Sequence, residues 1–150
     1  MREQISEALK TALKARDARR TSTLRAINAA IKDRDIAVRT ENRGPITNEE
    51  ILALLQKMVK QREESFAIYA EAGRHDLATA EKEEIDILNE FLPKPLSEDE
   101  VDAAIRAAIE KTGAEGPKDM GKVIGALKAD YPGRIDFGKA SARVKAALAG

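Results

Sequence analysis

Apolar side chains recur every three or four residues along almost the whole chain of 150 residues. No segment alternates apolar and polar residues in the way that a half-buried β-strand does. The helical spacing places the apolar residues on one face of each α-helix, and only 3% of the chain is aromatic, so these faces are aliphatic. We therefore predict an all-α protein whose helices pack on one another, because isolated helices are marginally stable in water.

Start and stop signals divide this pattern into seven predicted helices. The residues predicted to cap helix N-termini are Asp17, Thr47, Asp76, Ser97 and Asp136. Two of these, Thr47 and Ser97, are each followed three residues later by a glutamate, which is the spacing of a capping box. Gly73 is predicted to end the third helix in the left-handed conformation, which glycine adopts without steric cost.

The predicted helices fall into two groups. Pro93 and Pro95 end the fourth helix, because proline lacks an amide hydrogen and clashes with the preceding turn. We place a domain boundary there, with an N-terminal domain at residues 1–93 made of about four helices in a hairpin-like arrangement. Residues 94–150 are predicted to form a small three-helix bundle. The stripes predicted to pack in the first and third helices are Ile5, Ala8, Leu9, Ala12 and Leu13, and Ile51, Leu54, Leu55, Met58, Val59, Phe66 and Tyr69.

The composition argues against several classes of function. The absence of cysteine excludes disulfides, thiolate metal sites and a cysteine nucleophile. The single histidine, His75, has no recognisable partner for nucleophilic catalysis. The sequence also contains neither a phosphate loop nor an EF-hand loop, so we expect no catalytic residue, no metal and no other cofactor. With no apolar run of about 18 residues, we expect a cytoplasmic protein without a membrane partner.

The formal net charge is zero, but the charges are unevenly distributed. Residues 1–43 hold 11 basic and 6 acidic side chains, and residues 44–117 hold 8 basic and 17 acidic ones. Residues 118–150 hold 7 basic and 3 acidic ones. A basic C-terminal segment with few aromatic residues favours contact with a nucleic-acid backbone over stacking on unpaired bases. The alternative is that the basic ends face the acidic middle or water.

Gly121 and Gly125 lie one helical turn apart in the sixth predicted helix. Glycine in a helix interior costs about 1 kcal/mol relative to alanine, so a pair of them suggests that a backbone approaches closely. Close packing within the small bundle is the simpler explanation. The alternative is the approach of a sugar–phosphate backbone, with Lys118 and Lys122 beside it.

Several sequence segments together resemble the YqeY-like proteins. They are Gln61-Arg62-Glu63-Glu64-Ser65, Ala72-Gly73-Arg74, Phe91-Leu92-Pro93-Lys94-Pro95-Leu96-Ser97, Lys118-Asp119-Met120-Gly121-Lys122-Val123-Ile124-Gly125 and Gly133-Arg134. That family is similar to the tail of GatB, the B subunit of the tRNA-dependent amidotransferase, which helps to hold tRNA. The resemblance implies that residues 94–150 are a tail domain of the GatB/YqeY type.

The resemblance and the charge distribution lead to one main hypothesis, a non-catalytic, translation-associated module that binds tRNA or another structured RNA. It is expected to read no DNA sequence. The residues predicted to contact RNA are Lys118, Gly121, Lys122, Gly125, Arg134, Lys139 and Arg143. One alternative is a carbon–nitrogen ligase that uses glutamine as amido-nitrogen donor, a role implied by the resemblance alone. Another is a protein–protein adaptor for an amidotransferase or synthetase, with an apolar patch around Ile68 and Tyr69.

Overall fold

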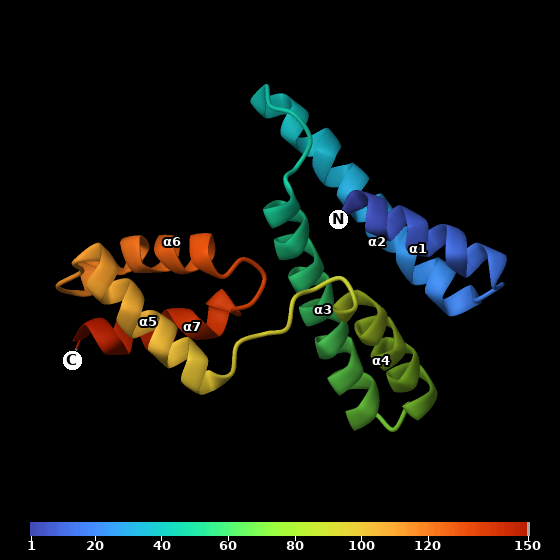
Figure 1. The fold of residues 1–150 in the computed structure, drawn as a ribbon. Coiled ribbons are helices and arrows are strands. Elements are labelled where there is room, and N and C mark those ends of the chain that lie inside the picture. Colours follow the sequence, from blue (N-terminus) through green and yellow to red (C-terminus); the bar gives the residue numbers. More distant parts are fainter. Residues whose placement is uncertain (150) are drawn as a thin grey trace. The chain divides into compact units, whose positions relative to one another are not determined.

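A computed structural model describes residues 1–149. Within this range the chain forms seven α-helices and two short 3-10 helices, and no β-strand (Figure 1). The helices are α1 (Arg2–Lys14), α2 (Ala18–Ala37), η1 (Val38–Glu41), α3 (Asn48–Glu71), α4 (His75–Asn89), α5 (Glu98–Thr112), η2 (Pro117–Asp119), α6 (Met120–Asp130) and α7 (Phe137–Ala149). The predicted all-α fold with seven helices is confirmed.

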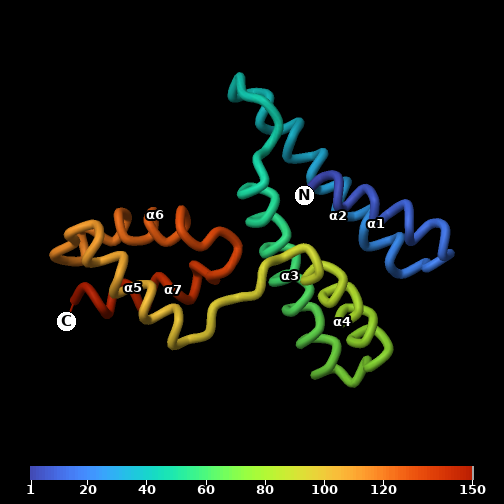
Figure 2. Tube along the Cα trace, in the orientation of Figure 1, coloured from blue at the N-terminus to red at the C-terminus, as the bar shows by residue number. Residues whose placement is uncertain are grey.

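The chain divides into two compact units, Met1–Leu92 and Pro93–Gly150. In the first unit, α1 and α2 form one hairpin and α3 and α4 form another, and α2 packs against both helices of the second hairpin (Figure 1). In the second unit, each of α5, α6 and α7 contacts the other two. The path of the chain through each unit can be followed in Figure 2.

Each unit buries its own aliphatic core. The core of the first unit consists of Ile5, Ala12, Leu24, Ile27, Ile31, Val38, Ile46, Ile51, Leu55 and Leu88. That of the second consists of Ala104, Ile105, Ala108, Val123, Leu127, Ile135, Ala140, Val144 and Leu148. Within residues 1–149, no helix is both long enough and apolar enough to span a membrane.

Most helix ends follow from local sequence, as predicted. Thr47 and Ser97 each form a complete capping box with the glutamate three residues later. The carboxylate of Asp17 accepts a hydrogen bond from the amide of Arg20, and that of Asp136 accepts one from the amide of Gly138. These hydrogen bonds satisfy amide groups that the first turn of a helix leaves without partners. At the C-terminal end of α3, Gly73 has a φ of +76°, in the left-handed region, as predicted.

The prediction that Asp76 caps α4 is wrong. A helix capped by Asp76 would begin at Leu77, but α4 begins two residues earlier, at His75. Its N-cap residue is Arg74, whose side chain makes no capping bond. Asp76 lies in the first turn instead, with its carboxylate 3.5 Å from Nε of Arg74. Hydrogen bonds from the Arg74 side chain and the Leu77 amide lower the pKa of Asp76. An acidic residue in the first turn still interacts favourably with the helix dipole.

Two residues of the predicted apolar stripes are exposed rather than packed. Leu13 is 46% exposed at the end of α1, and Phe66 is 37% exposed in the second half of α3. The residues of α3 that join the core or pack against it end at Val59. Periodicity identifies a helix face but not how far along the helix that face is covered by the rest of the unit.

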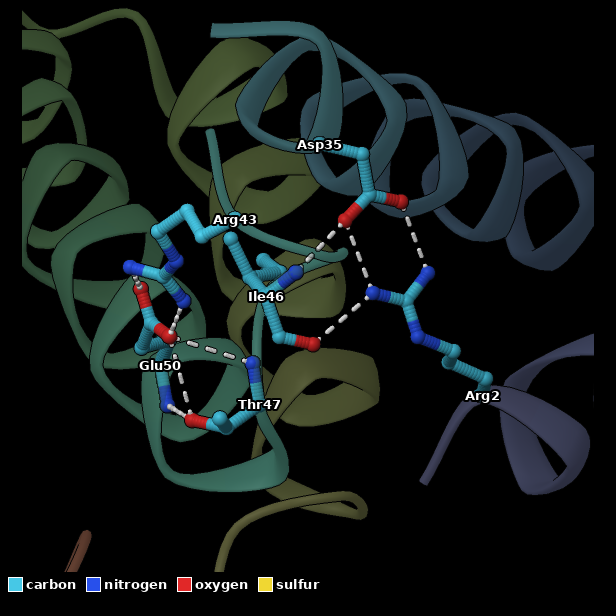
Figure 3. Close-up of polar contacts among 6 residues, drawn as sticks. All are labelled: Arg2, Asp35, Arg43, Ile46, Thr47 and Glu50. Atoms are coloured by element: carbon cyan, nitrogen blue, oxygen red, sulfur yellow. Dashed lines mark hydrogen bonds and ion pairs between the residues drawn. The ribbon is translucent and has the colours of Figure 1, made fainter. Parts of the chain in front are cut away.

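An ionic cluster joins α1, α2 and the segment that leads into α3 (Figure 3). The Arg2 guanidinium donates two hydrogen bonds of 2.8 Å to the carboxylate of Asp35 and one of 2.9 Å to the carbonyl of Ile46. The Ile46 amide in turn donates to Asp35 over 2.9 Å. The same view shows Arg43 paired with Glu50, the capping-box residue of α3. Bidentate pairing of this kind fixes direction as well as distance.

Asp35 makes the stability of the first unit sensitive to acid. Hydrogen bonds from the Arg2 side chain and the Ile46 amide lower the pKa of Asp35 from its ordinary 3.8 to about 2. Because the folded-state pKa is lowered, the ionised carboxylate stabilises the fold above pH 4 and this contribution is lost as the pH falls to about 2.

We expect Asp35→Asn to lower the thermal unfolding midpoint at pH 7 and to reduce its further fall between about pH 4 and pH 2, since the amide cannot ionise. Calorimetry at a series of pH values measures both effects. Asp33→Asn, on an exposed residue of the same helix, serves as the control. Equal pH profiles for the parent and Asp35→Asn would contradict this role of the cluster.

Candidate nucleic-acid interface

Four of the seven residues predicted to bind RNA lie together on η2 and α6. Val123 and Leu127 of α6 are buried in the core of the second unit. The exposed side of the same segment carries the four predicted residues Lys118, Gly121, Lys122 and Gly125, which we call the α6 surface. Because glycine has no side chain, the helix backbone itself forms part of this surface.

The two glycines of the α6 surface are not required for packing. A Cβ atom added at Gly121 or Gly125 would meet no atom within 4 Å. The explanation from close packing inside the bundle is therefore wrong for both positions. A Gly-x-x-x-Gly spacing is the same whether the glycines face a neighbouring helix or solvent, so the sequence did not separate the two cases. The cost of two helical glycines is left without a structural reason inside this unit.

The lysines beside the glycines differ in their surroundings. Nζ of Lys122 lies 3.7 Å from the carboxylate of Asp119, whereas Lys118 has no ion pair within the described residues. The amide of Glu115 donates a hydrogen bond of 3.0 Å to Asp119, and this bond, with the nearby lysines, lowers the pKa of Asp119. Asp119 therefore remains ionised at neutral pH, and it offsets part of the positive charge.

A further lysine extends the basic edge of the α6 surface. Lys128 lies seven residues after Gly121 and three residues after Gly125, and this spacing places it on the same side of the helix. Its Nζ lies 5.4 Å from the centre of the Phe137 ring, a distance typical of a cation–π contact. Sequence reasoning counted this lysine in the charge balance but did not assign it to the site, although helical spacing was enough to find it.

The other three predicted residues line a different feature. Arg134, Lys139 and Arg143, together with the acids Glu98 and Asp136, line a cavity of about 270 Å³ beside the N-terminal turns of α5 and α7, which we call the α5–α7 groove. Leu96, Val101, Ile135 and Ala140 supply apolar lining. No residue of the α6 surface lines this groove. The structure thus separates the predicted site into two sets.

Both arginines of the groove have partners in the folded chain. Nε of Arg134 donates to the carbonyl of Lys94 over 2.9 Å, and the carbonyl of Arg134 accepts from the amide of Leu96 over 2.9 Å. Arg143 lies 3.6 Å from the carboxylate of Glu98 and 3.3 Å from that of Asp102. These long-range partners could not be assigned from sequence spacing. Arg134 and Arg143 therefore hold the start of α5 in place.

Lys139 is the predicted groove cation whose side chain makes neither an ion pair nor a hydrogen bond within residues 1–149. Residues 1–149 also contain no group of three or more His, Asp or Glu side chains placed to hold a metal ion. His75 is exposed at the first residue of α4.

Comparison with known proteins assigns the chain to a family. The family described as Yqey-like protein matches residues 2–148, so the chain belongs to the YqeY-like family, as its sequence segments indicated. The curated relatives include three fungal proteins, each named altered inheritance of mitochondria protein 41, mitochondrial.

The relative from Pyrenophora tritici-repentis is 29% identical over 87% of this chain and 71% of its own length. The one from Vanderwaltozyma polyspora is 26% identical over 77% of this chain and 64% of its own length. That from Kluyveromyces lactis is 31% identical over 67% of this chain and 54% of its own length. The chain therefore spans between about half and seven tenths of these relatives.

The open surroundings of Gly121 and Gly125 lead to a stability prediction. We expect Gly121→Ala/Gly125→Ala to stabilise the second unit by about 1 to 2 kcal/mol, because alanine restricts the unfolded chain and favours the helix. Thermal or urea unfolding followed by circular dichroism measures the change. Destabilisation by either substitution would show that a backbone packs against this face after all.

Proposed function

We propose that this protein is a non-catalytic accessory module of translation that binds tRNA or another structured RNA through its C-terminal unit. The observation that carries the proposal is the α6 surface. Its glycines face open space, and Lys118 and Lys122 stand beside them. A phosphate backbone is the ligand whose chemistry fits a bare helix surface bordered by ammonium groups, since it supplies negative charge without needing a pocket.

The surroundings of this surface favour a double-stranded or folded RNA over an unpaired strand. Single strands are typically held by exposed aromatic rings on which the bases stack. The aromatic residues of the second unit, Tyr131 and Phe137, are only partly exposed and pack against its core. Recognition through shape and phosphate contacts requires no such rings.

The α5–α7 groove has a smaller part in this proposal. The guanidinium of Arg134 is engaged with a backbone carbonyl, and the charge of Arg143 is partly neutralised by two carboxylates. Lys139 is the groove residue best placed to contact a phosphate. We assign the main RNA contacts to the α6 surface and a supporting contact to Lys139.

An adaptor role is the second candidate, and one observation favours it. Ile68 of the predicted patch is 65% exposed on the last turns of α3, and its neighbour Tyr69 is partly exposed. Phe66 lies two residues from Ile68 and therefore faces another side of the helix. An exposed apolar patch of this kind is typical of a protein–protein contact. The adaptor role predicts that an amidotransferase or synthetase stays bound to this protein after RNase treatment. The Ile68→Glu variant should lose that binding. The glutamine-dependent ligase role rests on the family resemblance alone.

The α6 surface predicts a strong and specific effect of charge reversal. We expect Lys118→Glu/Lys122→Glu to weaken binding to total tRNA by at least about tenfold at low salt and to reduce the slope of log K against log salt by about 2, one for each phosphate contact. Fluorescence anisotropy at a series of salt concentrations measures both quantities.

Lys57→Glu/Lys60→Glu provides the matched control. It makes the same change of charge on exposed residues of α3, and it should leave tRNA binding within about twofold of the parent. The proposal fails if the parent does not bind RNA, or if the two variants bind equally at every salt concentration.

A further inference from the structure

The turn between α1 and α2 has an arginine where glycine is usual. The amide of Asp17 donates to the carbonyl of Ala12 over 3.0 Å, and that of Arg16 donates to the carbonyl of Leu13 over 3.2 Å. This pair of bonds defines a Schellman motif, whose left-handed residue is usually glycine. Here that residue is Arg16, with a φ of +56°. The position therefore holds a long cationic side chain in a backbone conformation that disfavours it.

Arg16 lines an open hollow on the same turn. The hollow has a volume of about 420 Å³ and is lined by Leu13, Arg16, Ala18, Thr21, Ser22 and Arg25; we call it the α1–α2 hollow. Two arginines and two hydroxyl-bearing residues thus line one space. Ser22 lies four residues after Ala18, and Arg25 lies three residues after Ser22, so the three share one face of α2.

The arginines of this region divide into two kinds. Arg19 lies 3.2 Å from the carboxylate of Glu83 and 3.9 Å from that of Glu84, and Arg20 is paired with Glu90. These two side chains attach the start of α2 to α4. Arg16 and Arg25, in contrast, form no ion pair within residues 1–149.

Asp17, the acidic residue nearest in sequence to Arg16, forms no ion pair with the arginines of the hollow within residues 1–149. The carboxylate of Asp17 accepts a hydrogen bond of 3.0 Å from the amide of Arg20 and so serves as the cap of α2. The guanidinium groups of Arg16 and Arg25 remain available to a ligand that is not part of the chain.

We propose that the α1–α2 hollow is a second phosphate-binding surface, which contacts the backbone of the same structured RNA. The inference rests on the proposed function and extends it to the first unit. Guanidinium groups donate two parallel hydrogen bonds to phosphate oxygens, and the Ser22 hydroxyl adds a donor of the kind common in phosphate contacts. The hollow is shallow and open, which suits a phosphodiester backbone that passes over it.

A membrane surface fits this hollow less well. Leu13 is the only large apolar side chain that lines it, and it is 46% exposed. A helix that lies on a bilayer buries a broad apolar face as well as presenting basic residues. The other exposed residues that line the hollow, Arg16, Ala18, Ser22 and Arg25, are small or cationic, so the chemistry is that of a polyanion site.

Two surfaces on one chain strengthen binding through effective concentration. Once the α6 surface holds an RNA, the second contact becomes intramolecular, so its loss lowers the overall affinity even when the contact alone is weak. Removal of the cations in the hollow should therefore weaken binding without abolishing it.

The test uses the full chain with Arg16→Gly/Arg25→Ala and the matched control Lys57→Ala/Lys60→Ala. We expect the arginine variant to bind tRNA at least about fivefold more weakly at low salt, with a salt slope lower by about 2, and the control to match the parent. Glycine suits the left-handed position, so Arg16→Gly alone should not lower the thermal unfolding midpoint. A loss of affinity without a loss of stability separates binding from folding.

The outcomes distinguish the two proposals. If Lys118→Glu/Lys122→Glu weakens binding while the arginine variant matches the parent in affinity and slope, this inference is overturned and the proposed function stands. If the parent binds no RNA, both are overturned. Binding of the parent, but not of the arginine variant, to phosphatidylserine vesicles, with RNA affinity unchanged, would assign the hollow to a membrane surface and would also overturn it.

Discussion

Each of the seven α-helices in residues 1–149 depends on the burial of one stripe of aliphatic side chains against other helices. The chain is only 3% aromatic, so the two cores are built from Ile, Leu, Val and Ala. Isolated helices of 11 to 24 residues are at best marginal in water, and the helices here are stable because their stripes meet. The remaining faces are free of packing constraints, and the candidate interfaces lie there.

The sequence predicts this fold well because its helix ends are set by local interactions. Thr47 and Ser97 cap their helices in the way that their spacing with glutamate requires. The failures lie where distant parts of the chain decide the outcome. Phe66 follows the apolar period of α3 but lies beyond the part of that helix which packs in the core. The ion pairs of Arg143 could not be found from the sequence either, because its partners Glu98 and Asp102 lie more than forty residues away; its contact with RNA stays a prediction.

The division of the cations between structure and ligand is the central feature of the proposed function. Arg2, Arg19 and Arg62 hold helices together through carboxylates on neighbouring elements. Lys118 of η2 and Arg16 of the turn between α1 and α2 have no such partner within residues 1–149, and both side chains are exposed. A zero net charge therefore conceals local basic surfaces, and such surfaces govern contact with a polyanion. The sequence indicated the cations of the C-terminal segment as candidates, but the ion pairs of the fold were needed to show which of the described cations have no carboxylate partner.

The most direct test of the central claim is lysine reactivity in the presence and absence of tRNA, mapped residue by residue by mass spectrometry. A phosphate contact covers the ammonium group and slows its acetylation. We expect bound tRNA to protect Lys118 and Lys122 while Lys57 and Lys60 on α3 stay as reactive as in the free protein. Equal reactivity of all four lysines with and without bound tRNA, or protection confined to α3, would contradict it.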